Sequence, residues 1–550
     1  MPRRSIFSAA DRDSLLAMPD AQDELIRHYT FSESDRAVIR QHRGPANRLG
    51  FAVQLCYMRY PGVAFGSDDI PFTPLLRFVA TQLKLAKECW EEYGRRDQTR
   101  REHLAELQSV FGFQAFGVRH YRAAVQGLDD LARQTDKGVV LATALIQSLR
   151  SQSILLPSVN VIDRLCAEAV TRANRRIFLS LTERLTEQHR RQLDALLGPR
   201  DDGKGVSGRA NVLAWLRQSP AAPNAKHLLE HMDRLTQLRA LNLPDGVERQ
   251  VHQNRLLKLA REGGQMTSQH LRDLEPARRY ATLVAVVLEA RATLTDEIID
   301  LNDRIIGTLF SRAKRSHEQQ FQQSGRAINE KVRLYGKIGN ALLAAKQSGS
   351  DPFAAIESVI SWEKFTQSVT EAQKLAGTED FDYLNRTGDG YTQIRRYAPA
   401  FLDALTMKAA PAAQDILDAV DTLKALNASN ARKLPKDAPT GFVKKRWETL
   451  VFTDDGVDRR FYELCALSEL KNALRSGDIW VQGSRQFKDF EEYLIPADAF
   501  APLLRDGTLP LAVTADGDRY LSDRLRLLSG QLETVDRMAK ADELPDAAVT

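Results

Sequence analysis

The sequence contains few cysteines and no cluster of the residue types that bind metal ions. Four cysteines occur in 550 residues, far apart and never as a Cys-x-x-Cys pair. This pattern excludes a disulfide framework and a cysteine-based zinc site, and it is typical of the reducing cytoplasm. The 10 histidines show no His-Glu-x-x-His or comparable spacing, so no residue is predicted to bind a metal ion.

Long hydrophobic segments are also missing. The N-terminal stretch "MPRRSIFSAADRDSLLAMPD" is interrupted by Ser, Asp and Arg, unlike the apolar core of a signal peptide. No stretch approaches the roughly 20 apolar residues of a membrane span. The most apolar one, "YATLVAVVLEARATL", contains Glu289 and Arg291 and is predicted to be a buried helix. We therefore expect a cytoplasmic chain with no membrane partner.

Motifs of common active sites are lacking as well. No Gly-x-Ser-x-Gly sequence occurs, and no cysteine has the sequence context of a nucleophile. The stretch "GPRDDGKG" matches part of a phosphate-binding loop, but Gly205 stands where Ser or Thr is needed, and a helix precedes it instead of a strand. We interpret this stretch as a surface linker, and we predict no catalytic residue.

What the sequence has is an ordinary globular composition with dispersed positive charge. Apolar residues make up 43% of the chain and charged residues 27%, with a formal net charge of +5. The length predicts three or four domains. The small positive excess permits a nucleic-acid partner without requiring one, and any single basic cluster is more often a solvated helix face. Several such clusters along one chain favour a long phosphate-contacting surface.

Helix signals dominate, so the predicted fold is a mostly α, multidomain helical array. Ser32 and Asp35 form a capping-box pattern, and the helix that follows ends at Gly44-Pro45. This helix and the next, joined by "GPAN", have the spacing of a helix-turn-helix. The second helix is apolar nearly all round, so we expect it to be buried and not to read DNA.

A short irregular stretch, "ALRSGDIWVQGSRQFKDF", follows a helix whose leucines recur at helical spacing. That helix is predicted to end at Gly477, and residues 478–486 are predicted to form a small β-containing segment. Trp480 in this segment has two interpretations that the sequence leaves open. It fills a core, or it belongs with the neighbouring basic residues to a surface that contacts a partner.

Three long segments resemble the Tn-three family of bacterial replicative transposon transposases. They are "FSESDRAVIRQHRGPANRLGFAVQLCYMRYPG" with "YGRRDQTRREHLAELQSVFGF", "RRYAPAFLDALTMKAAPAAQDILDAVDTLKALN", and "RRFYELCALSELKNALRSGDIWVQGSRQFKDFEEYLIP". The last is similar to a signature segment of the family. The resemblance is colinear from about Ile6 to Leu544.

The resemblance implies a protein that binds double-stranded DNA at the terminal inverted repeats of a transposon, as a homodimer in the full-length protein. It also implies a C-terminal RNase-H-like domain with a DDE carboxylate triad and two magnesium ions, which act on the attacking and leaving oxygens of a phosphodiester. Family members are much longer, and we expect their catalytic domain to lie beyond this chain. We therefore expect no cofactor in this chain, no cleavage by it alone, and association with the nucleoid through DNA.

Combined with the linker signals, the resemblance predicts the organisation of the chain. The predicted regions are a helical DNA-binding region (1–136), a second one (137–200), a linker (201–211), a long-helix domain for DNA binding or dimerisation (212–376), a loop (377–390), a helical segment (391–430), a basic irregular linker (431–457) and the signature region (458–550). The predicted DNA-binding residues are Arg95, Arg96, Thr99, Arg100, Arg101, Arg119, Arg122, Lys444, Lys445, Arg446, Arg475, Trp480, Ser484 and Arg485.

Two other functions are compatible with the same sequence. A truncated transposase acting as a repressor would compete for transposon ends with the same domains. A helical scaffold that binds only protein would have no measurable DNA affinity. For the signature segment, a contact with DNA and a purely structural role are both open.

Overall fold

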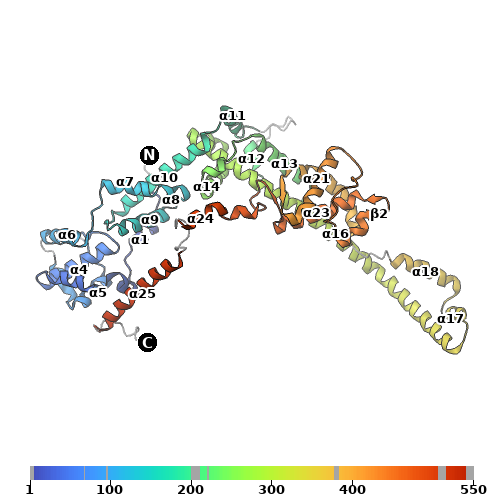
Figure 1. Ribbon diagram of the computed structural model, residues 1–550, viewed down its shortest axis with the longest axis horizontal. Coiled ribbons are helices and arrows are strands. Elements are labelled where there is room, and N and C mark those ends of the chain that lie inside the picture. Colours follow the sequence, from blue (N-terminus) through green and yellow to red (C-terminus); the bar gives the residue numbers. More distant parts are fainter. Residues whose placement is uncertain are drawn as a thin grey trace. The chain divides into compact units, whose positions relative to one another are not determined.

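The computed structural model describes residues 5–66, 69–93, 97–199, 211–219, 222–376, 383–505 and 516–540. Helices dominate these ranges and the strands are few and short, which confirms the predicted mostly α, multidomain class (Figure 1). The helix-turn-helix character of the domains stays a prediction. No helix within these ranges combines the length and the apolar content needed to cross a bilayer.

The chain divides into two compact units. Unit 1 comprises residues 1–186, 244–285 and 496–550, and unit 2 comprises residues 187–243 and 286–495. The elements of unit 1 are α1 (Ala9–Leu15), α2 (Gln22–Tyr29), α3 (Glu33–Arg40), α4 (Pro45–Arg59), α5 (Thr73–Leu83), η1 (Lys87–Glu92), α6 (Asp97–Phe111), α7 (Val118–Gly127), α8 (Asp129–Gln134), α9 (Gly138–Ser151), α10 (Val159–Thr182), η2 (Val247–Gln250), α14 (Gln253–Gln265), α15 (Ser268–Arg272), α24 (Ala497–Arg505) and α25 (Gly517–Lys540).

Unit 2 contains all the strands of the described ranges and most of the longest helix. Its elements are α11 (Glu187–Ala195), α12 (Val212–Leu216), α13 (Ala225–Ala240), α16 (Pro276–Ser348, of which the first turns belong to unit 1), α17 (Pro352–Val359), α18 (Trp362–Ala376), η3 (Tyr383–Gly390), α19 (Tyr391–Arg395), α20 (Ala398–Ala404), β1 (Met407–Ala409), η4 (Pro411–Ala413), α21 (Gln414–Ala428), α22 (Lys445–Val451), β2 (Phe452–Thr453), β3 (Gly456–Val457), α23 (Arg459–Ser476), β4 (Ile479–Val481) and η5 (Phe490–Tyr493).

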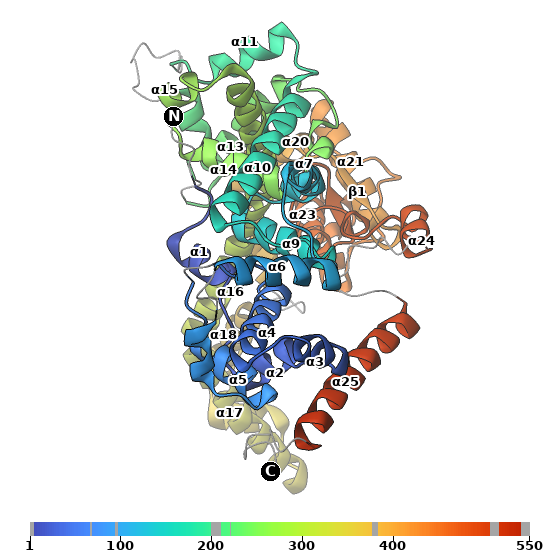
Figure 2. The same ribbon diagram turned by 90° about the vertical axis from the view of Figure 1, so that its left-hand side faces the viewer.

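Helix α4 is the centre of the first core of unit 1, which α2, α3, α5 and α6 surround (Figure 2). Every residue from Leu49 to Met58 is buried, as the apolar pattern predicted. Gly50 lets η1 approach, because a Cβ there would lie 2.2 Å from ring atoms of Tyr93. Asp35 closes the predicted capping box of α3 and also binds Arg59 of α4 at 2.6 Å. The surfaces of α4 are thus used for packing.

A second core of unit 1 lies among α1, α7, α8, α9 and α10. Ala169 and Ala173 bring α10 close to α8 because their side chains are small and fully buried. Asp163 of α10 fixes the start of the described chain, since it accepts hydrogen bonds from the backbone N–H of Ile6 at 3.1 Å and from Arg12 at 2.5 Å. The loop before α10 joins both cores through the hydrogen bond from Leu156 N to Gly62 O.

In unit 2, α23 is buried along most of its length and ends as predicted at Gly477, whose φ is +85°. Strand β4 follows at once and pairs antiparallel with β1, with Trp480 opposite Lys408. The small β-containing segment predicted near residue 478 therefore exists. Its partner strand comes from about 70 residues earlier, a pairing that local sequence patterns cannot indicate.

Two segments that were predicted to be a linker and a loop contain regular secondary structure. Within residues 431–457 the chain forms α22 and a β2–β3 hairpin, neither of which the sequence analysis predicted. Residues 383–390 form η3, with Leu384 buried. The linker residues 201–210 and the loop residues 377–382 lie outside the described ranges. The predicted domain boundaries stay predictions.

Candidate nucleic-acid interface

Helix α6 presents an inward face of apolar and aromatic contacts. Leu107 is fully buried, and His103 lies 3.0 Å from the hydroxyl of Tyr93, which also accepts a hydrogen bond from Gln54. His42 packs edge-on against His103. Burial, together with the charge of His42, lowers the pKa of His103 to about 4, so both rings are neutral at physiological pH.

Two adjacent arginines of α6 have different environments. The guanidinium of Arg100 lies over the rings of Trp90 and Tyr93, at 5.7 and 5.4 Å, and donates to Tyr93 O at 3.3 Å. The Arg101 side chain is exposed and has no hydrogen bond or ion pair with any residue of the described ranges. Thr99 is half-buried, and Arg95 and Arg96 lie outside the described residues.

Helix α7 has two exposed arginines and one buried residue, Val125. Its Tyr121 hydroxyl donates to Glu168 of α10 at 2.8 Å, and Gly117 N donates to the ring of His120, which caps the first turn. These contacts fix the helix by its inner face. Arg119 and Arg122 are both exposed, and neither has a polar partner in the part of the chain that the structure describes.

The third predicted basic cluster begins α22. Lys444 binds the buried carboxylate of Glu469 of α23 at 2.5 Å, and the fully buried Trp447 has its ring centre 6.0 Å from that of Phe310 in α16. Lys445 and Arg446 occupy its first turn and are exposed. Neither makes an ion pair with a described residue.

The signature segment is bound to α16 by one buried carboxylate. Asp296, 5% exposed, accepts hydrogen bonds from the Ser484 hydroxyl at 2.5 Å and from the backbone N–H of Arg485 at 3.1 Å. The Ser484 hydroxyl in turn accepts from Phe487 N at 2.7 Å. The Arg485 guanidinium forms an ion pair with Glu289 of the same helix.

A second contact between an arginine and a buried carboxylate lies further along α16. Arg475 donates from Nε to Asp303 at 2.7 Å, and Lys471 donates to the backbone carbonyl of that residue. Burial raises the pKa of Asp303, although the Arg475 guanidinium opposes the shift. Trp480 is half-buried in β4. The structure thus gives Arg475, Ser484 and Arg485 internal partners, which favours the structural one of the two interpretations of this segment.

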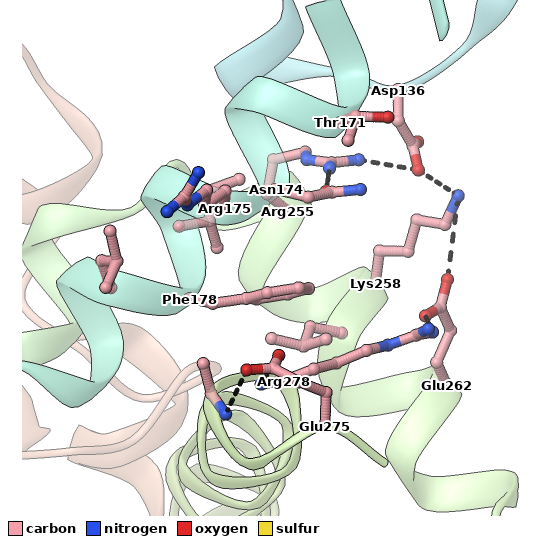
Figure 3. Close-up of a pocket in the computed structure, with 14 residues that line it drawn as sticks. Asp136, Thr171, Asn174, Arg175, Phe178, Arg255, Lys258, Glu262, Glu275 and Arg278 are labelled. Atoms are coloured by element: carbon pink, nitrogen blue, oxygen red, sulfur yellow. Dashed lines mark hydrogen bonds and ion pairs between the residues drawn. The ribbon is translucent and has the colours of Figure 1, made fainter. Parts of the chain in front are cut away.

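Sequence reasoning missed a cationic pocket in unit 1 (Figure 3). It has a volume of about 670 Å³ and lies between α10, α14 and the start of α16. Figure 3 shows the Phe178 ring between Asn174 on one side and Arg278 on the other. Its lining includes four cations and three carboxylates, which are Arg175, Arg255, Lys258, Arg278, Asp136, Glu262 and Glu275.

Most charges of the pocket are paired. Asp136 binds Arg255 at 2.7 Å and also binds Lys258. Burial opposes ionisation of Asp136, but the two cations outweigh it and lower its pKa. Arg278 and Lys258 lie 3.8 and 3.9 Å from Glu262. The spacing of Arg255 and Lys258 on one helix face was a usable signal, whereas Asp136 lies more than 100 residues away in sequence.

Metal-binding geometry does not occur in the same ranges. No group of three or more His, Cys, Asp or Glu side chains able to hold a metal ion is found among the residues that the structure describes.

These elements and surfaces define a helical protein with exposed, unpaired arginines on α6 and α7. A family profile described as a domain of unknown function, DUF4158, matches residues 6–169. The chain is 64% identical over 550 residues to the transposase for transposon Tn3926 of Escherichia coli. It is 63% identical to the transposase for transposon Tn21 of Escherichia coli and 56% identical to the transposase for transposon Tn501 of Pseudomonas aeruginosa.

Each of these matches covers 100% of this chain and 55% of the relative. The chain therefore spans about half the length of the curated relatives that it matches. By this similarity it belongs to the Tn-three family of bacterial transposases.

Proposed function

We propose that this chain is the DNA-binding, N-terminal part of a transposase for replicative transposition, and that it recognises the terminal inverted repeats of its transposon. The observation that carries the proposal is the similarity to transposases along the whole chain. The proposed setting is a bacterial cytoplasm, with attachment to the nucleoid through DNA. The proposed assembly is a homodimer, in which each protomer holds one transposon end.

The proposed contacts come from the unpaired cations of α6, α7 and α22. Arg119 lies in the first turn of α7, where the helix dipole and free backbone N–H groups favour a phosphate. Arg122 lies one turn further along, so both side chains can follow one DNA strand. Arg101, Lys445 and Arg446 add phosphate contacts, and base contacts are proposed for a helix lying in a major groove.

Strand cleavage and joining, with the magnesium ions they use, are proposed for the part of the full-length relatives that this chain does not span. The chain alone is proposed to bind ends without cutting them. A plasmid bearing both repeats should stay uncut in the presence of the purified chain and magnesium. Nicking at a repeat end would contradict this division of roles.

Fluorescence anisotropy on two duplexes tests the DNA-binding proposal. One duplex carries the terminal inverted repeat of the parent transposon, and the other has the same length and composition in scrambled order. At near-physiological salt, the repeat should bind at least about a hundredfold more tightly, within the range of specific recognition. Equal affinity for both duplexes would contradict repeat recognition, and no measurable affinity would favour a protein-binding scaffold.

A double variant locates the DNA-binding surface. Arg119→Ala with Arg122→Ala should weaken binding to both duplexes and reduce the slope of log affinity against log salt by about 0.9 for each phosphate that is no longer bound. Arg172→Ala is the matched control, since Arg172 is an exposed arginine of unit 1 that pairs with Glu168. The proposal for α7 is wrong if the control and the double variant behave alike.

A further inference from the structure

Helix α25 carries a continuous apolar stripe with no partner in the described part of the chain. Every described side chain of this helix is exposed. The large apolar ones on the stripe are Leu521, Leu525, Leu528, Leu532 and Val535, which are 57%, 61%, 50%, 59% and 42% exposed. Water-exposed leucines in such a continuous row mark a surface that another protein element covers.

The spacing along the stripe identifies the shape of that element. Successive members are four, three, four and three residues apart, which is the alternation of the a and d positions of a heptad. A helix facing one flat surface needs a wider apolar face, with three or four apolar residues in two turns. A stripe limited to a and d instead fits a second helix that carries a matching row of a and d side chains.

The flanks of the stripe permit a second copy of the same helix. Arg524 and Gln531 occupy the g positions, and Ser522, Ser529 and Asp536 occupy the e positions. No row of like charges borders the stripe, so two identical helices meet no repulsion along it. The charged pair Asp523 and Arg526, 3.6 Å apart, lies on the outer face and leaves the stripe free.

We propose that α25 pairs with α25 of a second copy of this chain in a two-stranded coiled coil. The inference rests on the homodimer of the proposed function and assigns a surface to it, but it does not depend on DNA binding. Leucine occupies both a positions and two of the three d positions in the stripe, so each layer of the pair buries two large side chains. Self-complementarity is what a two-fold homodimer interface requires.

Sedimentation velocity on the 550-residue chain tests the pairing. The unmodified chain should shift from monomer to dimer as its concentration rises through the micromolar range. Leu528→Asp, at the centre of the stripe, should abolish the dimer over that range. Leu527→Asp is the matched control, because Leu527 is 46% exposed on the same helix but lies off the stripe. The control should dimerise as the unmodified chain does.

Disulfide crosslinking gives an independent measurement. In a parallel, in-register pair, Leu528→Cys should give a covalent dimer on mild oxidation, because equivalent d residues then face each other. Leu527→Cys should give far less. The background is low, because Cys56, Cys166 and Cys465 are buried and Cys89 is half-buried.

Two outcomes would overturn the inference. The first is that the unmodified chain stays monomeric at every concentration, which would mean that the stripe packs against another part of the longer relatives. The other is a dimer that persists in Leu528→Asp, which would place the interface elsewhere. Because no described side chain of α25 is buried, Leu528→Asp should leave the fold of both units and the anisotropy signal for repeat DNA in place. A failure of the unmodified chain to bind DNA would instead contradict the proposed function.

Discussion

The α6–α7 region and the signature segment look alike in sequence and differ in structure. Both combine arginines with an aromatic residue beside a helix end. In α6 and α7, apolar packing and the hydrogen bond from Tyr121 to Glu168 fix the inner face, and Arg101, Arg119 and Arg122 form no ion pair with a described residue. In the signature segment, Arg475 and Arg485 are paired with carboxylates of α16. The two basic clusters therefore differ in whether the fold supplies a carboxylate partner, and the proposed DNA contacts come from the cluster without one.

Among the substitutions that test this contrast, Asp296→Ala should cause the largest loss of stability. It removes the acceptor of the Arg485 backbone N–H and of the Ser484 hydroxyl, and Ser484 is buried. Because each hydrogen bond to a charged group contributes about 1.5–3 kcal/mol, the free energy of unfolding of unit 2 should fall by about 4 kcal/mol. Hydrogen exchange of the α23 amides, followed by mass spectrometry, reports this loss without averaging over unit 1.

Asp300→Ala is the control for that measurement, since Asp300 is exposed one turn further along α16. Partial desolvation and the nearby Asp296 carboxylate raise the pKa of Asp300, so its charge is not a source of stability and its removal should change little. Suppose that Asp296→Ala leaves the α23 amides fully protected from hydrogen exchange but weakens DNA binding. The signature segment would then contact DNA, and the contrast between it and the α6–α7 region would be wrong.

Low pH should lower the stability of the other region, in which α6 packs in the first core of unit 1. The folded-state pKa of His103 is about 4, below its ordinary value of 6.5, so the unfolded chain takes up the proton first as the pH falls. The stability from the neutral ring is complete above about pH 6.5 and is lost as the pH falls toward 4. Between pH 7 and 5 the first core of unit 1 should lose about 2 kcal/mol.

Hydrogen exchange of the buried α4 amides at pH 7 and pH 5, corrected for intrinsic rates, measures that loss. His103→Gln removes the titrating ring and should flatten most of the pH dependence, with His42, whose pKa burial also lowers, accounting for the remainder. The α23 amides of unit 2 serve as the internal control. A pH dependence that is unchanged in His103→Gln would assign the acid sensitivity to other groups.

Arg100 and Arg101 test the contrast within one helix. Arg100→Ala loses the stacking on Trp90 and Tyr93 and should lower the stability of the first core by about 1.5 kcal/mol. Arg101→Ala should leave stability unchanged and reduce the salt slope of DNA binding by about 0.9. Hydrogen exchange of the α4 amides measures the first effect and anisotropy measures the second. The assignment is reversed if Arg101→Ala is the destabilising change.

Local patterns in the sequence predicted much of the fold and only part of the candidate interface. The capping box of Ser32, the buried α4 and the end of α23 at Gly477 follow from residues only a few positions apart. The bond between Ser484 and Asp296 joins residues 188 positions apart, and no local pattern reports such a partner. Whether a given arginine has a partner within the fold depends on such distant carboxylates, so the sequence could name the basic clusters but could not tell which of them are paired.

Arg485→Ala should have the smallest effect and gives the most direct comparison. The ion pair of Arg485 with Glu289 joins two partly exposed side chains, so its loss should cost about 0.5 kcal/mol. The backbone N–H of residue 485 still binds Asp296 in this variant, so the segment keeps its place. Affinity for repeat DNA and its salt slope should both match the unmodified chain.

A drop in the salt slope of about one unit in Arg485→Ala would instead mean that Arg485 leaves Glu289 to bind a phosphate. Arg101→Ala, measured in parallel, removes the same single charge from an unpaired position. Because the two variants have equal net charge, any difference between their salt slopes reflects where the arginine lies and which partner it has. Equal reductions in both variants would show that pairing within the fold does not decide which arginines bind DNA.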